Sequence, residues 1–159
     1  MMIHSREQLL ELRTLIQGTI DRLYVDDSNI INRLGLEKSL TFRFGLYFKE
    51  AISEIDWLNT LTLDMEYNKN GDRPKRTPRR PRGAQPDLIL HQRNSNLRNS
   101  IVFEIKGWWN NEDRRIDHVK LEDFTHQDGE YKYGLGVFLD FQREACPLIF
   151  YVNSEQIII

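Results

Sequence analysis

The chain has 159 residues, of which 22 are basic and 24 acidic, so its net charge is −2, and 40% of its residues are apolar. This balance fits one folded domain over residues 1–159 and excludes a disordered chain or a general nucleic-acid coat protein. The single cysteine, Cys146, excludes an internal disulfide and a cysteine-based zinc cluster. Because no apolar run approaches the roughly 20 residues that cross a bilayer and no secretory signal opens the chain, we expect a cytoplasmic protein with no membrane partner.

Two helices are predicted before the first strand. The first runs from Ser5 to about Tyr24, because Ser5 is a suitable N-cap and apolar residues follow at steps of three and four. The second runs from about Leu36 to Ile55, and its apolar stripe is typical of a helix that packs against a sheet. We treat residues 1–30 as an N-terminal helical extension of the domain.

Strands and one more helix are predicted in the rest of the chain. Apolar and polar residues alternate over 61–67, and short apolar runs over 86–91 and 101–106 form a predicted hairpin. A helix is expected over 112–124, followed by strands over 134–141 and 147–152. The resulting order ααβββαββ predicts an α/β fold with a mixed sheet and helices on its faces.

Residues 71–84 form a basic loop. Its central ten residues hold six basic side chains and three prolines without a single acid, so this segment is neither a helix nor a central strand. We predict that it grips nucleic-acid phosphates, although an exposed segment without a target has the same composition. The six candidate contacts are Arg73, Lys75, Arg76, Arg79, Arg80 and Arg82.

Charged residues interrupt the predicted strands at positions that are expected to meet. Glu104 and Lys106 alternate with apolar neighbours, so they project from one face of their strand, about 6.6 Å apart. Asp87 opens the neighbouring strand, and Glu66 lies on the polar side of the strand over 61–67. Clustered carboxylates need a cation or a proton, and Mg²⁺ prefers oxygen ligands. With a lysine beside them, these residue types suit phosphodiester hydrolysis.

The spacing of these residues resembles the motif of the PD-(D/E)XK nuclease superfamily. Pro86-Asp87 is followed after sixteen residues by Glu104-Ile105-Lys106. The pattern is most similar to that of a small, largely uncharacterised bacterial and phage branch. In that branch a helix that starts Glu-x-Ser-x-x-x-Arg precedes a strand that ends Glu-Tyr-Asn, as residues 37–43 and 66–68 read here. The likeness covers about residues 36–151 and leaves out the leading helix.

The resemblance implies a restriction-endonuclease-like fold and a nuclease that depends on Mg²⁺ or Mn²⁺. It implies that Asp87, Glu104 and the backbone carbonyl of Ile105 hold the metal, and that Lys106 positions the attacking water. Glu37 corresponds to a helical acid that assists the metal through water in many members, and Glu66 to an acid found only in some branches. DNA is favoured over RNA as the nucleic-acid partner.

Several alternatives remain open at this point. Glu-x-Lys is a weak motif, because residues 130–132 repeat it in a turn, and Glu104 with Lys106 also fits a plain ion pair on a strand. Glu37 also fits a first-turn residue that the helix dipole favours. A nuclease fold without turnover would serve as a nucleic-acid-binding or assembly subunit, and an arginine-rich loop also suits an acidic protein partner. The apolar tail over 157–159 fits either a homodimer interface or the core.

Overall fold

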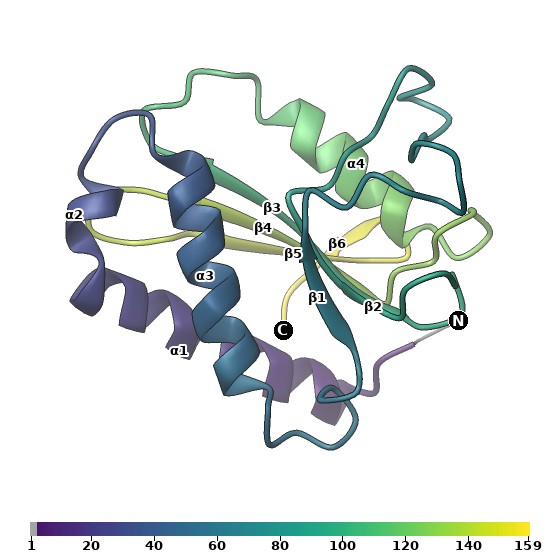
Figure 1. The fold of residues 1–159 in the computed structure, drawn as a ribbon, viewed down its shortest axis with the longest axis horizontal. Helices are drawn as coiled ribbons and strands as arrows, with labels where there is room; N and C mark the ends of the chain where they lie inside the picture. Colours follow the sequence, from purple (N-terminus) through teal and green to yellow (C-terminus); the bar gives the residue numbers. More distant parts are fainter. Residues whose placement is uncertain (1–2) are drawn as a thin grey trace.

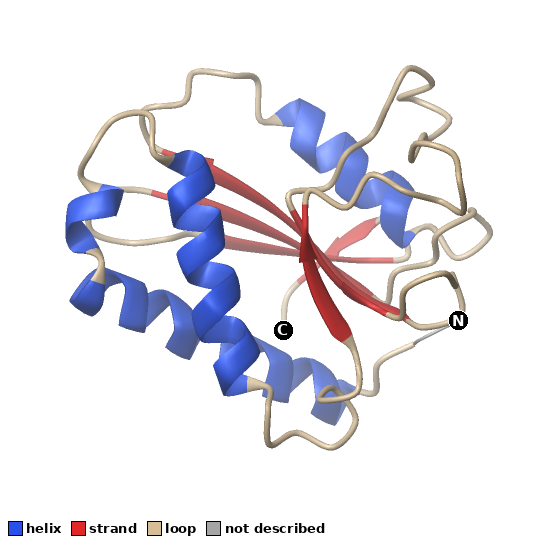
Figure 2. Cartoon of the chain, in the orientation of Figure 1, coloured by secondary structure: helices blue, strands red, loops and turns tan. Residues whose placement is uncertain are grey.

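The computed structural model describes residues 3–159 and places helices on both faces of one six-stranded sheet (Figures 1 and 2). The strands follow one another across the sheet in the order β1-β2-β3-β4-β5-β6. The elements are α1 (Arg6–Asp26), α2 (Ser28–Ile31), α3 (Glu37–Ala51), β1 (Thr62–Met65), β2 (Leu88–His91), β3 (Asn99–Gly107), α4 (Arg115–Thr125), β4 (Leu135–Phe141), β5 (Leu148–Val152) and β6 (Glu155–Ile157).

The sheet is mixed, which confirms the predicted α/β class. β3 and β4 are parallel, whereas every other neighbouring pair is antiparallel. A parallel pair needs a crossover connection, and α4 supplies it between β3 and β4. Helices α1 to α3 lie on one side of the sheet and α4 lies on the other (Figure 1).

Two hydrophobic cores lie on the two sides of the sheet, and the alternation of β3 explains them. Ile101, Phe103 and Ile105 pack into the core beneath α1 and α3, whereas Val102 packs into the core beneath α4. Glu104 and Lys106 therefore point toward α4, on the face that the sequence predicts. The face is not open to solvent, however, because all nine residues of β3 are buried.

The structure differs from several predicted elements: β1 covers only Thr62–Met65, and α4 begins at Arg115 instead of residue 112. Helix α3 ends at Ala51 instead of Ile55, because the chain tightens there into turns, as the hydrogen bond from Ser53 N–H to the Glu50 carbonyl shows. The one-turn helix α2 was not predicted, since four residues carry no periodic signal. Strand β6 was not predicted either.

Strand β6 explains the apolar tail. Asn153 and Ser154 have φ values of 49° and 67°, the conformation of a tight two-residue hairpin turn, and they fold β6 back onto β5. Ile157 and Ile159 then pack against the core beneath α1 and α3. This placement supports the reading in which the tail finishes the core, and a homodimer stays a prediction.

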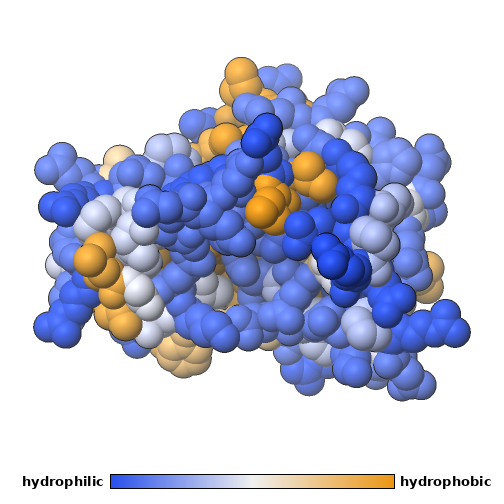
Figure 3. All heavy atoms as spheres, turned by 90° about the horizontal axis from the view of Figure 1, so that it is seen from above, coloured by the Kyte–Doolittle hydropathy of each residue, from blue (hydrophilic) through white to orange (hydrophobic). Residues whose placement is uncertain are grey.

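Over residues 3–159, no helix is long and apolar enough to cross a membrane. The face on which α4, the basic loop and the loop after β3 lie in Figure 1 is predominantly hydrophilic, with isolated apolar groups (Figure 3). That character suits a polar or charged ligand.

Candidate functional site

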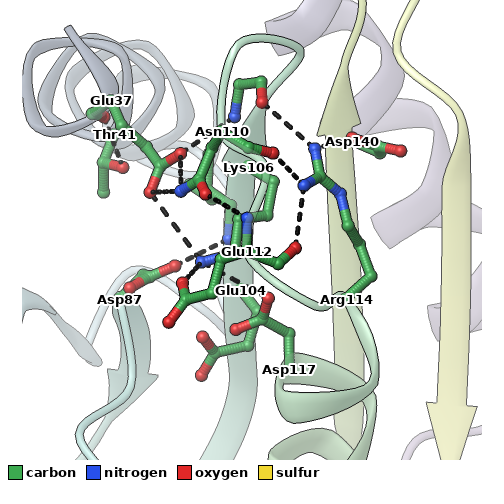
Figure 4. A network of polar contacts seen from close by, with 12 residues as sticks. Glu37, Thr41, Asp87, Glu104, Lys106, Asn110, Glu112, Arg114, Asp117 and Asp140 are labelled. Carbon is green, nitrogen blue, oxygen red and sulfur yellow. Dashed lines mark hydrogen bonds and ion pairs between the residues drawn. The ribbon is translucent and has the colours of Figure 1, made fainter. Parts of the chain in front are cut away.

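A group of charged side chains lies where β2 begins and β3 ends, and its members range from fully buried Glu104 to exposed Glu112 (Figure 4). Leu88 pairs with Phe103 across the antiparallel hairpin, so Asp87 and Glu104 are the next pair along the two strands. Helix α3 contributes its first residue, the loop after β3 contributes one acid, and α4 adds an acid and a lysine. We call the acids the carboxylate cluster: Glu37, Asp87, Glu104, Glu112 and Asp117.

Asp87 is fixed to β3 through the backbone. Its Oδ2 accepts a hydrogen bond of 2.7 Å from the N–H of Ile105, which lies between Glu104 and Lys106 in the motif. Burial raises the pKa of Asp87, while the ammonium of Lys120 and the Ile105 N–H oppose the rise. The Asp87 carbonyl in turn accepts the N–H of Glu66 at 2.9 Å, so β1 helps to hold this corner.

Glu104 is the most deeply buried acid of the cluster, with 0% exposure. The ammonium Nζ of Lys120 lies 2.5 Å from its Oε2, but neither carboxylate oxygen has a partner with hydrogen-bond geometry. Burial and then the nearby Asp87 raise the pKa of Glu104 well above its ordinary value, against the opposing charge of Lys120. The charges of Glu104, Asp87 and Asp117 in turn raise the pKa of Lys120 against the effect of its burial, so its ammonium is the positive charge closest to Glu104.

Lys106 carries a permanent positive charge at the centre of the site. Its Nζ lies 2.9 Å from Glu112, 3.4 Å from Asp117 and 3.9 Å from Glu37, and its side chain is 8% exposed. Burial alone would lower the pKa of Lys106, but the hydrogen bond to Glu112 and the charges of the other acids outweigh it and raise the pKa. Lys106 is therefore suited to stabilise negative charge and to donate hydrogen bonds, and it is not suited to accept a proton.

Glu37 ties the start of α3 to the end of β3. Its Oε2 accepts the N–H of Gly107 at 3.0 Å and the side-chain amide of Asn110 at 3.0 Å. Gly107 is required at this point, because a Cβ there would lie 2.4 Å from the ring of Trp109. Glu37 is thus a first-turn acid of α3 that also lies 3.9 Å from Lys106, and its predicted assistance to a metal stays a prediction.

Glu66 supports the site through its backbone N–H and not through its carboxylate. Its carboxylate pairs with Lys38 at 3.1 Å on the exposed rim, whereas its N–H holds the Asp87 carbonyl. The residue has a φ of 50°, the left-handed conformation, at the end of β1. The structure therefore directs the Glu66 side chain toward Lys38, and the predicted role of this carboxylate at the reaction centre loses support.

Sequence reasoning missed two site residues, Asp117 and Lys120. They lie three residues apart on α4, so they share one face of the helix, and that face covers Glu104 and Lys106. A signal was present, because Lys120 falls on the apolar stripe of this predicted helix, where a charge needs a buried partner. Two further site residues were missed: Asn110 lies in a loop without periodic pattern, and Glu112 lies before α4, which begins at Arg115 instead of the predicted residue 112.

The donor atoms of the cluster are of the kind that binds a divalent cation, although their present spacing is too wide to hold one. Among residues 3–159, no three acidic, histidine or cysteine side chains are grouped closely enough to hold a metal ion. Within residues 3–159 the five carboxylates nevertheless share two ammonium groups, Lys106 and Lys120, and neither oxygen of Glu104 has a partner with hydrogen-bond geometry. Carboxylate oxygens in excess over cationic partners are the donor chemistry that Mg²⁺ and Mn²⁺ use.

The basic loop divides into anchoring and exposed residues. Lys75 is 2% exposed; it donates to the Lys69 carbonyl at 2.5 Å and lies against the rings of Tyr67 and Tyr131. Arg79 pairs with Glu122 and Asp123 of α4. These two residues hold the loop to the body of the protein, so they are poor candidates for the predicted phosphate contacts.

The remaining four basic residues keep the predicted role. The side chains of Arg73, Arg76 and Arg82 are exposed, and Arg80 is half-buried. The charge of Arg80 contributes to the lowered pKa of Glu112, after the larger effects of Lys106 and Lys120, so this arginine acts on the edge of the carboxylate cluster through its charge.

The buried ammonium of Lys75 predicts a specific pH dependence of stability. Burial lowers the pKa of Lys75 from 10.5 to about 8, against the charge of Glu130. Between these values the unfolded chain binds more protons than the folded protein, so stability rises with pH and is lost as the pH falls toward 8. From pH 7.5 to 9.5 we expect the parent to gain on the order of 1–2 kcal/mol relative to Lys75→Met.

Urea unfolding of both proteins at the two pH values measures this gain. Lys69→Met, which removes an exposed lysine shortly before the basic loop, is the control and should track the parent. A constant difference between the parent and Lys75→Met would show that the ammonium is not buried in solution.

Comparisons of the chain with protein-family models, with curated proteins and with solved structures gave no match. The resemblance to the PD-(D/E)XK superfamily therefore rests on the motif residues and on their positions in the fold.

Proposed function

We propose that this protein is a metal-dependent nuclease that hydrolyses phosphodiester bonds of nucleic acid, with DNA favoured over RNA. The main support is the arrangement of Asp87, Glu104 and Lys106, which lie at the start of β2 and the end of the paired strand β3, within one cluster of five carboxylates and two ammonium groups. The hydrophilic face and the exposed arginines of the basic loop suit a polyanionic substrate.

Each residue of the motif has a distinct role in this proposal. Asp87, Glu104 and the backbone carbonyl of Ile105 would hold the cation, and Mg²⁺ or Mn²⁺, when bound, supplies a Lewis acid for the phosphate. Lys106 donates hydrogen bonds to the attacking water and stabilises the charge that develops on phosphorus-bound oxygens. Glu37, Glu112 and Asp117 hold the Lys106 ammonium in place.

The reaction adds water across one phosphodiester bond. The water oxygen forms a new bond to phosphorus, the bond from phosphorus to the 3′-oxygen breaks, and the 3′-oxygen leaves with a proton. The products are a 5′-phosphate and a 3′-hydroxyl, in accord with the resemblance.

A panel of end-labelled substrates tests the proposal. Single- and double-stranded DNA and RNA are incubated with Mg²⁺, with Mn²⁺ or with a chelator, and the ends of the products are identified. We expect cleavage only with a divalent cation and a 5′-phosphate on the product. If none of these substrates is cut under any condition, the protein is not a nuclease of this kind.

A second candidate is a nucleic-acid-binding subunit that has no turnover. The observation in its favour is the ion pair between Glu104 and Lys120, because a permanent lysine counter-ion would make a metal unnecessary. Such a protein would shift nucleic acid in a gel in the presence of chelator and would cleave nothing after Mg²⁺ or Mn²⁺ is restored.

Both candidates predict that the exposed arginines of the basic loop bind phosphates. Replacing Arg76 and Arg82 by alanine should weaken binding and reduce the slope of log K against log salt by roughly 1.4–1.8, because each lost phosphate contact removes about 0.7–0.9. The matched control replaces Arg6 and Arg13, which are exposed on α1. Fluorescence anisotropy across a salt series in chelator gives the slopes, and equal slopes for the two double variants would remove the loop from the interface.

A further inference from the structure

We propose that Lys120 is a built-in counter-ion of Glu104 that a divalent cation displaces when it binds. The proposal deepens the nuclease assignment and rests on its metal site, to which it adds a positioning residue on α4. In this view the ammonium holds the buried carboxylate in place while the cation is absent, and it sets how tightly the cation binds.

The surroundings of Glu104 make a counter-ion necessary. The side chain is fully buried, and its two oxygens have no hydrogen-bond partner, so an isolated carboxylate there would be strongly destabilising. The only ion pair of Glu104 within residues 3–159 is the contact of 2.5 Å with Lys120. The ammonium thus lies at the carboxylate that the motif assigns to the cation.

The contacts of Lys120 allow its ammonium to move away from Glu104. Apart from Glu104, its Nζ donates to the carbonyl of Gln85 at 3.0 Å and lies 3.6 Å from Oδ1 of Asp117, one turn earlier on α4. Its side chain is 11% exposed and carries the ammonium on a flexible four-carbon stem. A short movement would bring Lys120 closer to Asp117 and keep it paired with an acid.

Lys106 differs from Lys120 in this respect. Three acids from three segments surround Lys106: Glu37 at the start of α3, Glu112 in the loop after β3, and Asp117 on α4. These contacts fix it in place. The two lysines therefore have different roles: Lys106 stays at the reaction centre, and Lys120 exchanges with the cation.

Mn²⁺ binding measured by calorimetry without nucleic acid tests the exchange. Lys120→Met removes the competing charge but keeps a side chain of similar length, so we expect Mn²⁺ to bind at least tenfold more tightly than to the parent. Lys120→Arg keeps the charge and should not gain affinity. Arg115→Met removes one charge from the solvent side of the same helix, where the side chain is 87% exposed, and should stay within twofold of the parent. Equal or weaker binding by folded Lys120→Met would overturn the proposal.

A measurement on the parent protein covers the case in which Lys120→Met does not fold. Brief acetylation with acetic anhydride, followed by peptide mapping, reports whether each lysine is accessible. With saturating Mn²⁺, labelling of Lys120 should rise several-fold, while labelling of Lys106 should stay constant. Unchanged labelling of Lys120 with Mn²⁺ bound, or no Mn²⁺ binding by the parent, would contradict the exchange.

The cleavage panel separates this inference from the proposed function. Displacement of Lys120 by Mn²⁺ without cleavage of any substrate would support the exchange and reject the nuclease. Metal-dependent cleavage with Lys120 unaffected by Mn²⁺ would support the nuclease and reject the exchange.

Discussion

Replacing Lys106 by methionine is expected to lower the rate of cleavage by about 10²–10³-fold, the usual cost of losing one preorganised electrostatic donor. The ammonium is fixed by acids from three segments and stays protonated, so it stabilises the charge that develops during attack on phosphorus. Methionine keeps the buried stem and removes only this charge. Nucleic-acid binding in chelator should change little, because the exposed arginines of the basic loop supply it.

Single-turnover cleavage with excess enzyme measures this effect without interference from product release. Lys38→Met is the matched control, because it removes a largely exposed ammonium from the rim of the same site and should leave the rate within about twofold. Circular dichroism and thermal unfolding confirm that both variants fold. A Lys106→Met protein that cuts as fast as the parent would show that the mechanism does not use this ammonium.

The part of the site that the sequence predicts correctly depends on local periodicity. In β3, alternation places Glu104 and Lys106 on one face, which follows from the two-residue repeat of a strand. The register that pairs Leu88 with Phe103 then brings Asp87 next to Glu104. The same reasoning predicts that residues 71–84 form a loop, because proline excludes helix and central strand.

The part that the sequence does not predict depends on contacts between distant segments. Lys120 reaches Glu104 only because α4 crosses over from β3 to β4 on that side of the sheet, and no pattern within 112–124 specifies the crossing. Lys75 looks like a phosphate contact because composition records its charge, whereas the rings of Tyr67 and Tyr131 that cover it lie elsewhere in the chain. Burial of a charge is a tertiary property.

The same limit applies to Asp64. Its position on the polar side of β1 indicates a solvent-exposed residue, but it accepts hydrogen bonds from Arg93 and contacts His91 at 2.9 Å. His91 and Arg93 lie at the far end of β2, which pairs antiparallel with β1. The alternation correctly predicts the face of the strand on which a residue lies. Its contact partner depends on the neighbouring strand.

Removing either member of the pair formed by Glu104 and Lys120 is expected to lower the free energy of unfolding by about 3 kcal/mol in chelator, because each change leaves a buried charge without its nearest partner. Lys120→Met leaves the carboxylate without its ion pair, and Glu104→Gln leaves the ammonium with Asp117 at 3.6 Å and the Gln85 carbonyl. The double variant leaves neither charge behind. It should therefore be less destabilised than the sum of the two single variants by at least about 1 kcal/mol, the size of coupling measured between residues in direct contact.

A double-mutant cycle by urea unfolding at pH 7 measures this coupling. The reference cycle uses Arg115 and Asp113, an ion pair of similar length on the exposed side of the protein, where solvent screens the charges. If the coupling of the buried pair does not exceed that of the exposed pair, Lys120 does not stabilise Glu104. In that case the carboxylate must be kept neutral by a proton, because full burial next to Asp87 leaves it no other compensation.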